Sequence, residues 1–475
     1  MARIDIASLV FLSTLAVTFG AAFFARMRAS QNGPDEELAG RRLNRWLIGL
    51  SAGTTGNSGF VVTGAVGLGY VGGAHWLMLA ISWLVGDLVY WSIFPARLNR
   101  VARESRAITL SDMLTSNLNG KAAQAISFLV AAILVAFLST YTAAQWLAGK
   151  KFLSGMFSFS DYTALLLFAG TIILYSTLGG FRGSIYTDFV QAIIRIVGTA
   201  IALAAVSWYA IADSDSFYRN IASAGPGFFE LFPDSTTTSI LGFILGYAAA
   251  AVGFGLGQPQ IVSRYMAGSS PEETKRAMWI YIFFLQFTWL AMTAFGMILR
   301  GVMPGIADPE AGLSLFFRQN ITPVVTGIIF ADVFATIAST SNGILVVMAQ
   351  TFVRNILPIG KKSAASEKIK ITAVTFALGL VTIGLSMLLP GNVFSIAIDS
   401  VSEIAAGLAG AVMIKVLGWR HTAGSLLVAI IGGIGSALLW KALGYDAIFN
   451  EAGVGMLASI TGSWIYSRWT SAQTA

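Results

Sequence analysis

Five carboxylates and one basic residue lie within or at the edges of long apolar runs of this sequence. The acids are Asp87, Asp188, Asp332, Asp399 and Glu403, and the base is Arg195. Such a group costs roughly 3 kcal/mol when it is unpaired in a membrane, so each is a functional candidate by default. We expect one acid to pair with Arg195. The remaining negative charge favours a route for a cation, or a substrate that carries an amino group.

The residue types that other kinds of chemistry require are scarce. The chain has no cysteine, which excludes a disulfide framework, a thiolate zinc site and a cysteine nucleophile. Its two histidines, His75 and His421, leave little for a histidine-ligated transition metal, so no such site is expected. No nucleotide-binding loop is recognisable. An enzyme is therefore the least favoured class, and no organic cofactor is expected.

Membrane-spanning helices are the elements that would position these residues. Of 475 residues, 56% are hydrophobic and 11% are charged, against about a quarter charged in an ordinary soluble chain. We predict an all-α polytopic membrane protein with about thirteen transmembrane helices, since thirteen apolar runs approach the ~20 residues that a span needs. They cover roughly 6–24, 46–69, 76–94, 122–147, 162–178, 185–211, 240–262, 278–299, 323–353, 371–389, 393–417, 425–440 and 452–467.

The distribution of lysine and arginine predicts the orientation. Most of the 30 basic residues fall in the loops near 25–45, 95–121, 179–184, 263–277, 354–370 and 415–424. These loops share one side of a thirteen-span chain, which the positive-inside rule assigns to the cytoplasm. The N-terminus would then lie outside and the C-terminus inside, in a plasma (inner) membrane. The net charge of +7 reflects this topology, so nucleic acid is not expected as a partner.

Two of the predicted spans contain residues that weaken a helix. Residues 49–59 read Gly-Leu-Ser-Ala-Gly-Thr-Thr-Gly-Asn-Ser-Gly, and Gly253, Gly255 and Gly257 precede Gln258 and Pro259. Broken backbone is tolerated at membrane depth only where it is buried in protein or lines a cavity. The two segments open successive five-span blocks, which is typical of inverted repeats around a binding site. The alternative interpretation is close helix packing through small residues.

Four segments resemble the sodium:solute symporter family, above all its sodium/proline branch. They are Leu-Gly-Gly-Phe-Arg-Gly-Ser-Ile-Tyr-Thr-Asp-Phe-Val-Gln at 178–191, and the segments 50–60, 257–266 and 335–345. The resemblance implies a leucine-transporter-like 5+5 inverted repeat in a single transporter domain, 1–475. It places an extra N-terminal helix at 1–26, the first repeat at 46–211, the second at 237–417 and two C-terminal helices at 425–470.

The same resemblance implies a sodium site and its residues. Backbone carbonyls of Thr54, Asn57 and Thr336 and the hydroxyls of Ser339 and Thr340 would bind the ion. Oxygen ligands suit a hard cation, although adjacent hydroxyls in a helix also bond back to the preceding turn. Asp188 would serve sodium passage toward the cytoplasm. Asn342 and Gly343 stand where members with a second ion have hydroxyls, which favours one coupled ion.

The residues that would bind the solute are not carried over from the branch. Gly56 stands where the branch has an aspartate, and Ala251 and Gly255 stand where it has large aromatics. The candidates left near the expected cavity are Ser58, Tyr141, Gln145, Gln258, Ser402 and Glu403. We expect Glu403 to recognise an amino group. The alternative is a protonated side chain that is hydrogen-bonded to a neighbouring carbonyl.

The sequence therefore predicts a sodium-coupled symporter that imports a small organic solute, most simply one that is amino-acid-like or bears an amino group. Two alternatives stay open: a transporter-like membrane sensor, or a family member that moves a sugar, a carboxylate or a vitamin. The expected partners are the solute, Na⁺ as coupling ion and the lipid bilayer, with no obligatory protein partner.

Overall fold

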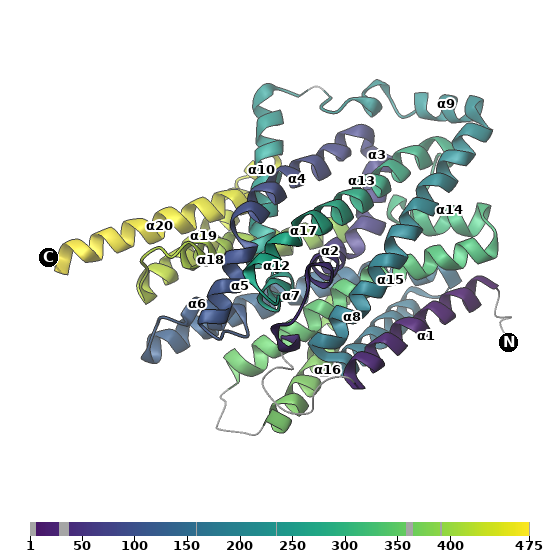
Figure 1. Ribbon diagram of the computed structural model, residues 1–475. Helices are drawn as coiled ribbons and strands as arrows, with labels where there is room; N and C mark the ends of the chain where they lie inside the picture. The colour runs from purple at the N-terminus through teal and green to yellow at the C-terminus, as the bar shows by residue number, and fades with distance from the viewer. Residues whose placement is uncertain are drawn as a thin grey trace.

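The computed structural model describes residues 6–27, 38–157, 159–233, 235–357, 364–389 and 392–474, which form a bundle of helices (Figure 1). The long helices are α1 (Ile6–Met27), α2 (Arg45–Val62), α4 (Leu77–Ile93), α7 (Gly120–Phe157), α8 (Asp161–Ala212), α10 (Thr237–Gly257), α13 (Met278–Val302), α15 (Pro323–Thr351), α16 (Ala364–Leu388), α17 (Val393–Ile404), α19 (Ala423–Ala442) and α20 (Glu451–Thr474). The short ones are α3 (Gly64–Gly72), α5 (Pro95–Glu104), α6 (Leu110–Thr115), α9 (Ser214–Ala222), α11 (Pro259–Met266), α12 (Pro271–Arg276), α14 (Gly312–Asn320) and α18 (Gly410–Val416).

Every predicted apolar run falls on a helix of the structure. Within the described residues, nine helical stretches are long and apolar enough to cross a membrane, and Ile6–Gly20 and Asp161–Thr177 are shorter apolar stretches. One predicted loop is wrong: residues 179–184 lie inside α8, which kinks where Gly180 has φ 59°. Only glycine adopts such a backbone without strain, so two spans are joined by a bend instead of a loop.

Helix breaks occur in both glycine-rich segments, as predicted. In α2 the helical backbone is interrupted at Ser58, whose φ is 51° and ψ is 172°. Between α10 and α11, Gln258 is extended with φ −84° and ψ 105°, and Pro259 starts the next helix. Proline suits a first helical position because its missing N–H would have no partner there. The backbone around these two breaks is buried.

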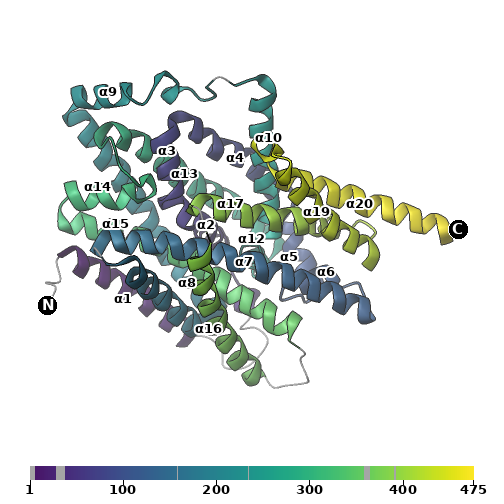
Figure 2. The same cartoon turned by 180° about the vertical axis from the view of Figure 1, so that it is seen from behind.

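Helix α15 forms the centre of the bundle. Every residue from Ile329 to Thr351 is buried, which is unusual for a helix with this many hydroxyl groups. It packs against α1, α2, α7, α8 and α16, and the view from behind shows it running between α7 and α8 (Figure 2). The polar side chains of α15 must therefore find their partners inside the protein.

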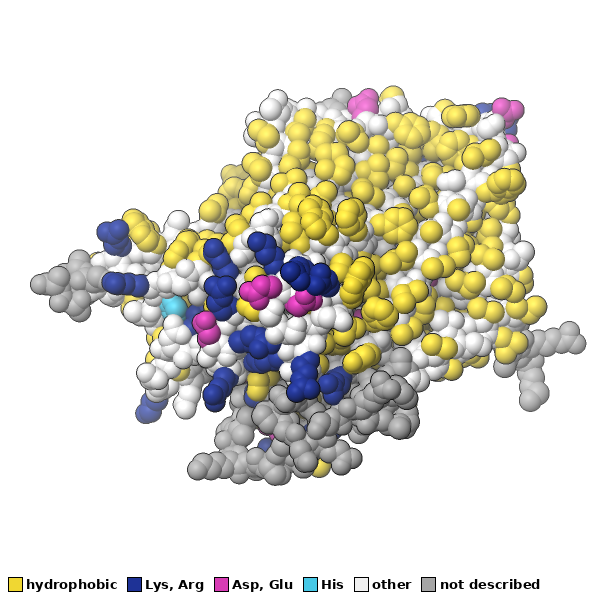
Figure 3. Space-filling view, in the orientation of Figure 1, with side chains coloured by type: hydrophobic (Ala, Val, Ile, Leu, Met, Phe, Trp, Pro, Cys, Tyr) yellow, Lys and Arg dark blue, Asp and Glu magenta, His cyan; other side chains and the backbone are white. Residues whose placement is uncertain are grey.

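The outside of the bundle is divided between an apolar surface and a basic end. Figure 3 shows hydrophobic side chains over α3, α4, α8 and α13, and exposed examples are Val89, Val197 and Phe283. Lysine and arginine side chains gather in the same view around α5 and α12. We call this region the basic end. The start of α1 and the end of α20 lie at opposite ends of the bundle (Figures 1 and 2).

Candidate functional site

The five residues expected to bind sodium lie on α2 and α15, which pack together. Thr54, Asn57, Thr336, Ser339 and Thr340 are each at most 1% exposed. The Thr340 hydroxyl donates to the carbonyl of Thr55 at 2.9 Å, which joins the two helices next to the Ser58 break. The structure therefore brings the predicted residues of α2 and α15 to one buried junction.

Asp188 of α8 lies at the centre of this junction. Its Oδ1 accepts a hydrogen bond from Ser339 at 2.7 Å. Its Oδ2 accepts from Ser51 at 2.6 Å and from Thr55 at 3.2 Å. The carboxylate thus contacts a proposed sodium ligand directly, in addition to the passage role that the sequence predicted.

Arg264 neutralises Asp188, and the sequence analysis missed it. It was expected in a cytoplasmic loop, but α11 continues to Met266 and carries Arg264 into the interior, where it is fully buried. Its guanidinium lies 3.2 Å from Asp188 and donates to Ser184 at 2.7 Å and to the Gln260 carbonyl at 2.7 Å. The count of one buried base was therefore wrong. The Pro259 helix start was the signal that could have extended the span to include Arg264.

Arg195 pairs with Asp332, as one acid was expected to do. The two fully buried groups are 2.9 Å apart. Gly198 makes the approach possible, because a Cβ there would lie 2.5 Å from Asp332 Oδ2. The Thr336 hydroxyl bonds back to the Asp332 carbonyl at 2.9 Å, which leaves its own carbonyl as the expected ligand atom.

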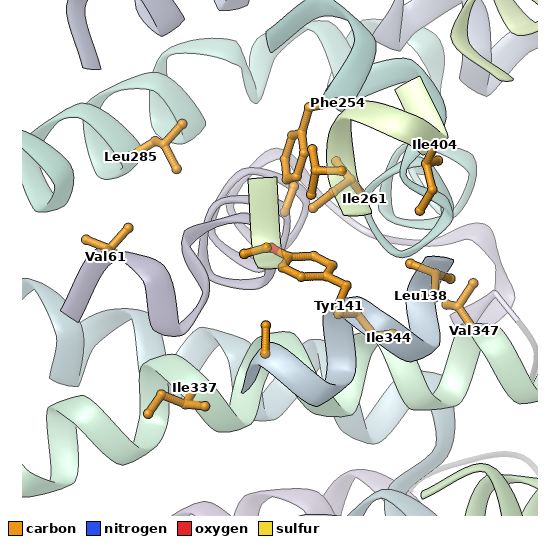
Figure 4. Packing of buried hydrophobic residues seen from close by; sticks show 14 of the residues in the cluster. Val61, Leu138, Tyr141, Phe254, Ile261, Leu285, Ile337, Ile344, Val347 and Ile404 are labelled. Carbon is orange, nitrogen blue, oxygen red and sulfur yellow. The ribbon is translucent and has the colours of Figure 1, made fainter. Parts of the chain in front are cut away.

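A pocket lies beside the α2 break and encloses about 550 Å³ of space free of protein atoms, part of it open to the outside. Two of the six predicted solute residues, Ser58 and Tyr141, line it. The remaining walls are mostly apolar and aromatic: Phe60, Val61, Leu79, Trp83, Phe254, Leu285, Trp289, Phe394, Ala397, Ile398 and Val401, with Gly56 and Asn57. Figure 4 shows Tyr141 of α7 and Phe254 of α10 in the packed region between the helices.

The other four candidates do not line this pocket. Gln145 Oε1 accepts from the Gly59 N–H at 2.7 Å and so supports the α2 break. Gln258 Oε1 accepts from Gln260 at 2.9 Å within the α10–α11 break. Gln145 thus bonds to the broken backbone of α2 and Gln258 to a neighbouring side chain, and their positions in the sequence did not reveal these contacts.

Ser402 and Glu403 lie on the side of α17 that faces the C-terminal helices. The Ser402 hydroxyl lies 3.4 Å from Asn450 Oδ1. Glu403 is buried, its Oε2 has no hydrogen-bond partner among the described residues, and its charged neighbours are Glu451, Lys441 and Asp399. Lys441 itself pairs with Asp399 at 2.6 Å. Glu403 does not line this pocket, which meets α17 at Ala397, Ile398 and Val401.

Comparison with known proteins identifies the family. Residues 37–431 match the sodium:solute symporter family. The chain is 26% identical to the high-affinity proline transporter PutP of Bacillus subtilis, over 95% of each chain. It is 25% identical to the sodium/pantothenate symporter of Haemophilus influenzae, over 96% of this chain and 95% of that one.

Solved structures show the same fold. A Na⁺-coupled sialic acid symporter in a substrate-bound outward-open state superposes with a TM-score of 0.82 at 18% identity, over 98% of each chain. A nucleobase-cation-symport-1 family transporter in a closed conformation gives a TM-score of 0.54 at 12% identity, over 94% of this chain and 97% of that one. This chain belongs to the sodium:solute symporter family. It is a multi-pass membrane transporter whose coupling ion is Na⁺, not an enzyme.

Proposed function

We propose that the pocket beside the α2 break binds a small amino-acid-like solute, which the chain imports together with one sodium ion by alternating access. One observation carries the proposal: Asn57 lines the pocket and is also one of the residues assigned to the sodium site. The broken segment of α2 therefore belongs to both sites. Sodium bound to its carbonyls would fix the pocket wall, so that each ligand favours the conformation that the other needs.

Thr54, Asn57, Thr336, Ser339 and Thr340 would hold the ion, with Asp188 beside them as the carboxylate nearest the site. Unwound backbone at a helix break supplies carbonyl oxygens, and the adjacent helix supplies hydroxyls, which together suit a hard cation. The buried junction of α2, α8 and α15 supports this assignment, because Ser339 and Thr340 already bridge those helices.

The order of the long helices supports an inverted repeat around this site. The first repeat would cover 46–211 and the second 237–417, each opening with its broken helix, α2–α3 and α10–α11. The helix at 1–26 and the pair at 425–470 would lie outside the repeats; residues 1–5 are not among those described. The basic end would face the cytoplasm, with the N-terminus outside and the C-terminus inside.

The lining of the pocket favours a compact solute with an apolar body. Rings of Trp83, Phe254 and Trp289 surround the space, and Asn57, Ser58 and Tyr141 provide its polar side chains. Relatives named for proline and pantothenate transport fit a solute of this size class. Asn57 Oδ1, which has no hydrogen-bond partner among the described residues, would accept a hydrogen bond from an amino group of the solute.

Uptake into proteoliposomes tests the proposal. We expect an inward sodium gradient to drive accumulation of at least one radiolabelled member of a panel of the twenty amino acids, pantothenate and N-acetylneuraminate. Replacing sodium with potassium should abolish it. Sodium-dependent binding without accumulation would support a membrane sensor instead. Uptake restricted to pantothenate or N-acetylneuraminate would leave symport standing and overturn the amino-acid class.

A further inference from the structure

Asp87 of α4 is a buried carboxylate that the symport site does not use. It is 1% exposed, and its Oδ2 has no hydrogen-bond partner within the described part of the chain. The two other fully buried aspartates, Asp188 and Asp332, are each paired with an arginine. Asp87 therefore differs from them in having no cationic partner among the described residues, and an unpaired carboxylate at membrane depth is costly unless a function retains it.

Aromatic side chains of α4 and of two neighbouring helices lie near Asp87. Tyr265 of α11 and Tyr281 of α13 lie within its electrostatic reach. Trp91 lies one turn further along α4, and the centroid of its ring is 5.1 Å from the ring centroid of each of these two tyrosines. The Tyr265 hydroxyl and the Trp91 indole N–H are buried and also have no hydrogen-bond partner among the described residues.

Tyr90 is the last aromatic residue near Asp87, and its hydroxyl is hydrogen-bonded. It donates to the Gly255 carbonyl at 2.8 Å and so ties α4 to the end of α10, beside the second helix break. We call Asp87, Tyr90, Trp91, Tyr265 and Tyr281 the α4 cluster. The cluster therefore combines four aromatic rings with one carboxylate that no cation of the described residues neutralises and two further polar groups, the Tyr265 hydroxyl and the Trp91 N–H, that have no hydrogen-bond partner among those residues.

The α4 cluster lies between the solute pocket and the basic end. Trp83, which lines the pocket, precedes Asp87 by one helical turn and so lies on the same face of α4. The other end of α4 leads directly into α5, whose arginines belong to the basic end. A solute that leaves the pocket toward the cytoplasm along α4 would meet Asp87 next.

We propose that Asp87 is a second, transient binding site for the amino group of the solute, used during release to the cytoplasm. The inference rests on the proposed function and assigns its solute class. A carboxylate with aromatic side chains close to it can bind an organic ammonium, through charge and through cation–π attraction. A sodium ion would need more oxygen ligands than this cluster offers, and among the described residues no group of three or more acidic or histidine side chains is placed to hold a metal ion.

The test compares wild type with Asp87→Asn in proteoliposomes, using each amine-bearing amino acid that wild type accumulates. Asparagine keeps the shape of the side chain and removes its charge. We expect the rate of sodium-driven uptake to fall at least tenfold. The affinity for the same amino acid, measured in detergent in the presence of sodium, should change less than threefold. Asp87→Glu should retain part of the uptake. Ser82→Ala on the same helix is the matched control, because its buried hydroxyl only bonds back to Met78 and its loss should leave uptake unchanged.

Tyr265→Phe gives an independent measurement, since it removes only the unpartnered hydroxyl and keeps the ring. A release step slowed by this variant should lower uptake and leave binding intact. Uptake by Asp87→Asn within twofold of wild type would overturn the inference. A parallel loss of uptake and binding would also overturn it, because a merely structural role acts on both. Absence of sodium-driven uptake in wild type would instead overturn the proposed function itself.

Discussion

At the scale of single residues, the hydroxyls of α15 differ in whether they bond to other helices or within their own helix. Ser339 and Thr340 bond across to Asp188 and to the Thr55 carbonyl, so they join three helices at the proposed sodium site. The neighbouring Ser341 bonds back to the Ile337 carbonyl at 2.7 Å, within its own helix. Three consecutive hydroxyls that look alike in the sequence are therefore separated by the direction in which each one points.

This difference makes a prediction about sodium dependence. Ser339→Ala and Thr340→Ala each remove one proposed ligand in a desolvated site, where an unmade polar contact costs about 1–3 kcal/mol. We expect the sodium concentration for half-maximal uptake to rise by roughly tenfold or more, with little change in the maximal rate. Ser341→Ala is the control and should behave like wild type. Unchanged sodium dependence in both test variants would place the ion elsewhere.

The Arg195–Asp332 pair supports a prediction about stability. Breaking a fully buried ion pair by removing one partner costs about 3–5 kcal/mol, because the other charge is left uncompensated. Arg195→Met should therefore lower the apparent melting temperature of the purified protein, as followed by tryptophan fluorescence. Adding Asp332→Asn should recover most of the loss. A double variant no more stable than Arg195→Met would show that the charge pairing is not what holds α8 against α15.

At the scale of elements, the break in α2 is strained as well as polar. Ser58 has φ 51° and ψ 172°, a region of backbone space that glycine adopts readily and other residues rarely do. Its hydroxyl accepts from the Phe60 N–H at 3.1 Å, and Gln145 accepts from the Gly59 N–H at 2.7 Å. These bonds replace helical partners lost at the break, so the packing of α7 against α2 holds an unfavourable backbone in place.

Two substitutions at Ser58 separate strain from hydrogen bonding. Ser58→Gly relieves backbone strain worth about 1–3 kcal/mol and loses the hydrogen bond from the Phe60 N–H. Its stability should therefore be equal to or above that of wild type. Ser58→Ala loses the same hydrogen bond and keeps the backbone strain, so its melting temperature should fall below that of the glycine variant. Thermal unfolding in detergent measures both. The opposite order would mean that the backbone at Ser58 is not strained in solution.

At the scale of the whole molecule, charge and apolar surface agree on how the bundle sits in a membrane. The apolar surface over α3, α4, α8 and α13 is bordered by the basic end at α5 and α12 (Figure 3). The start of α9, with Asp213 and Asp215, lies at the end of the bundle away from it (Figure 1). Basic residues are retained on the cytoplasmic side of membrane proteins, so we expect the basic end to face the cytoplasm.

Single cysteines can test this orientation, because the native chain contains none. We expect Asp213→Cys to react with a membrane-impermeant maleimide added to intact cells. Lys275→Cys, on exposed α12, should react only after the membrane is permeabilised. Sodium-dependent uptake by each variant is the control for native folding. Reaction of both cysteines from the same side would contradict the proposed N-outside, C-inside arrangement.

The sequence by itself determined those features that depend on neighbouring residues. Apolar runs of spanning length became helices, and the glycine-rich segments broke at Ser58 and Gln258, because helix propensity and hydrophobicity act locally.

Only the tertiary structure decided which charges meet. Arg264 and Asp188 are 76 positions apart and Arg195 and Asp332 are 137 apart, so no local pattern pairs them. Helix α11 extends about one turn beyond the predicted span and places Arg264 in the interior. Glu403 faces Lys441 and Glu451 near the C-terminal helices, whereas other residues of α17 line the pocket. Ion pairing and cavity lining depend on the relative rotation of whole helices, which is fixed by packing across the bundle and not by the sequence of any one helix.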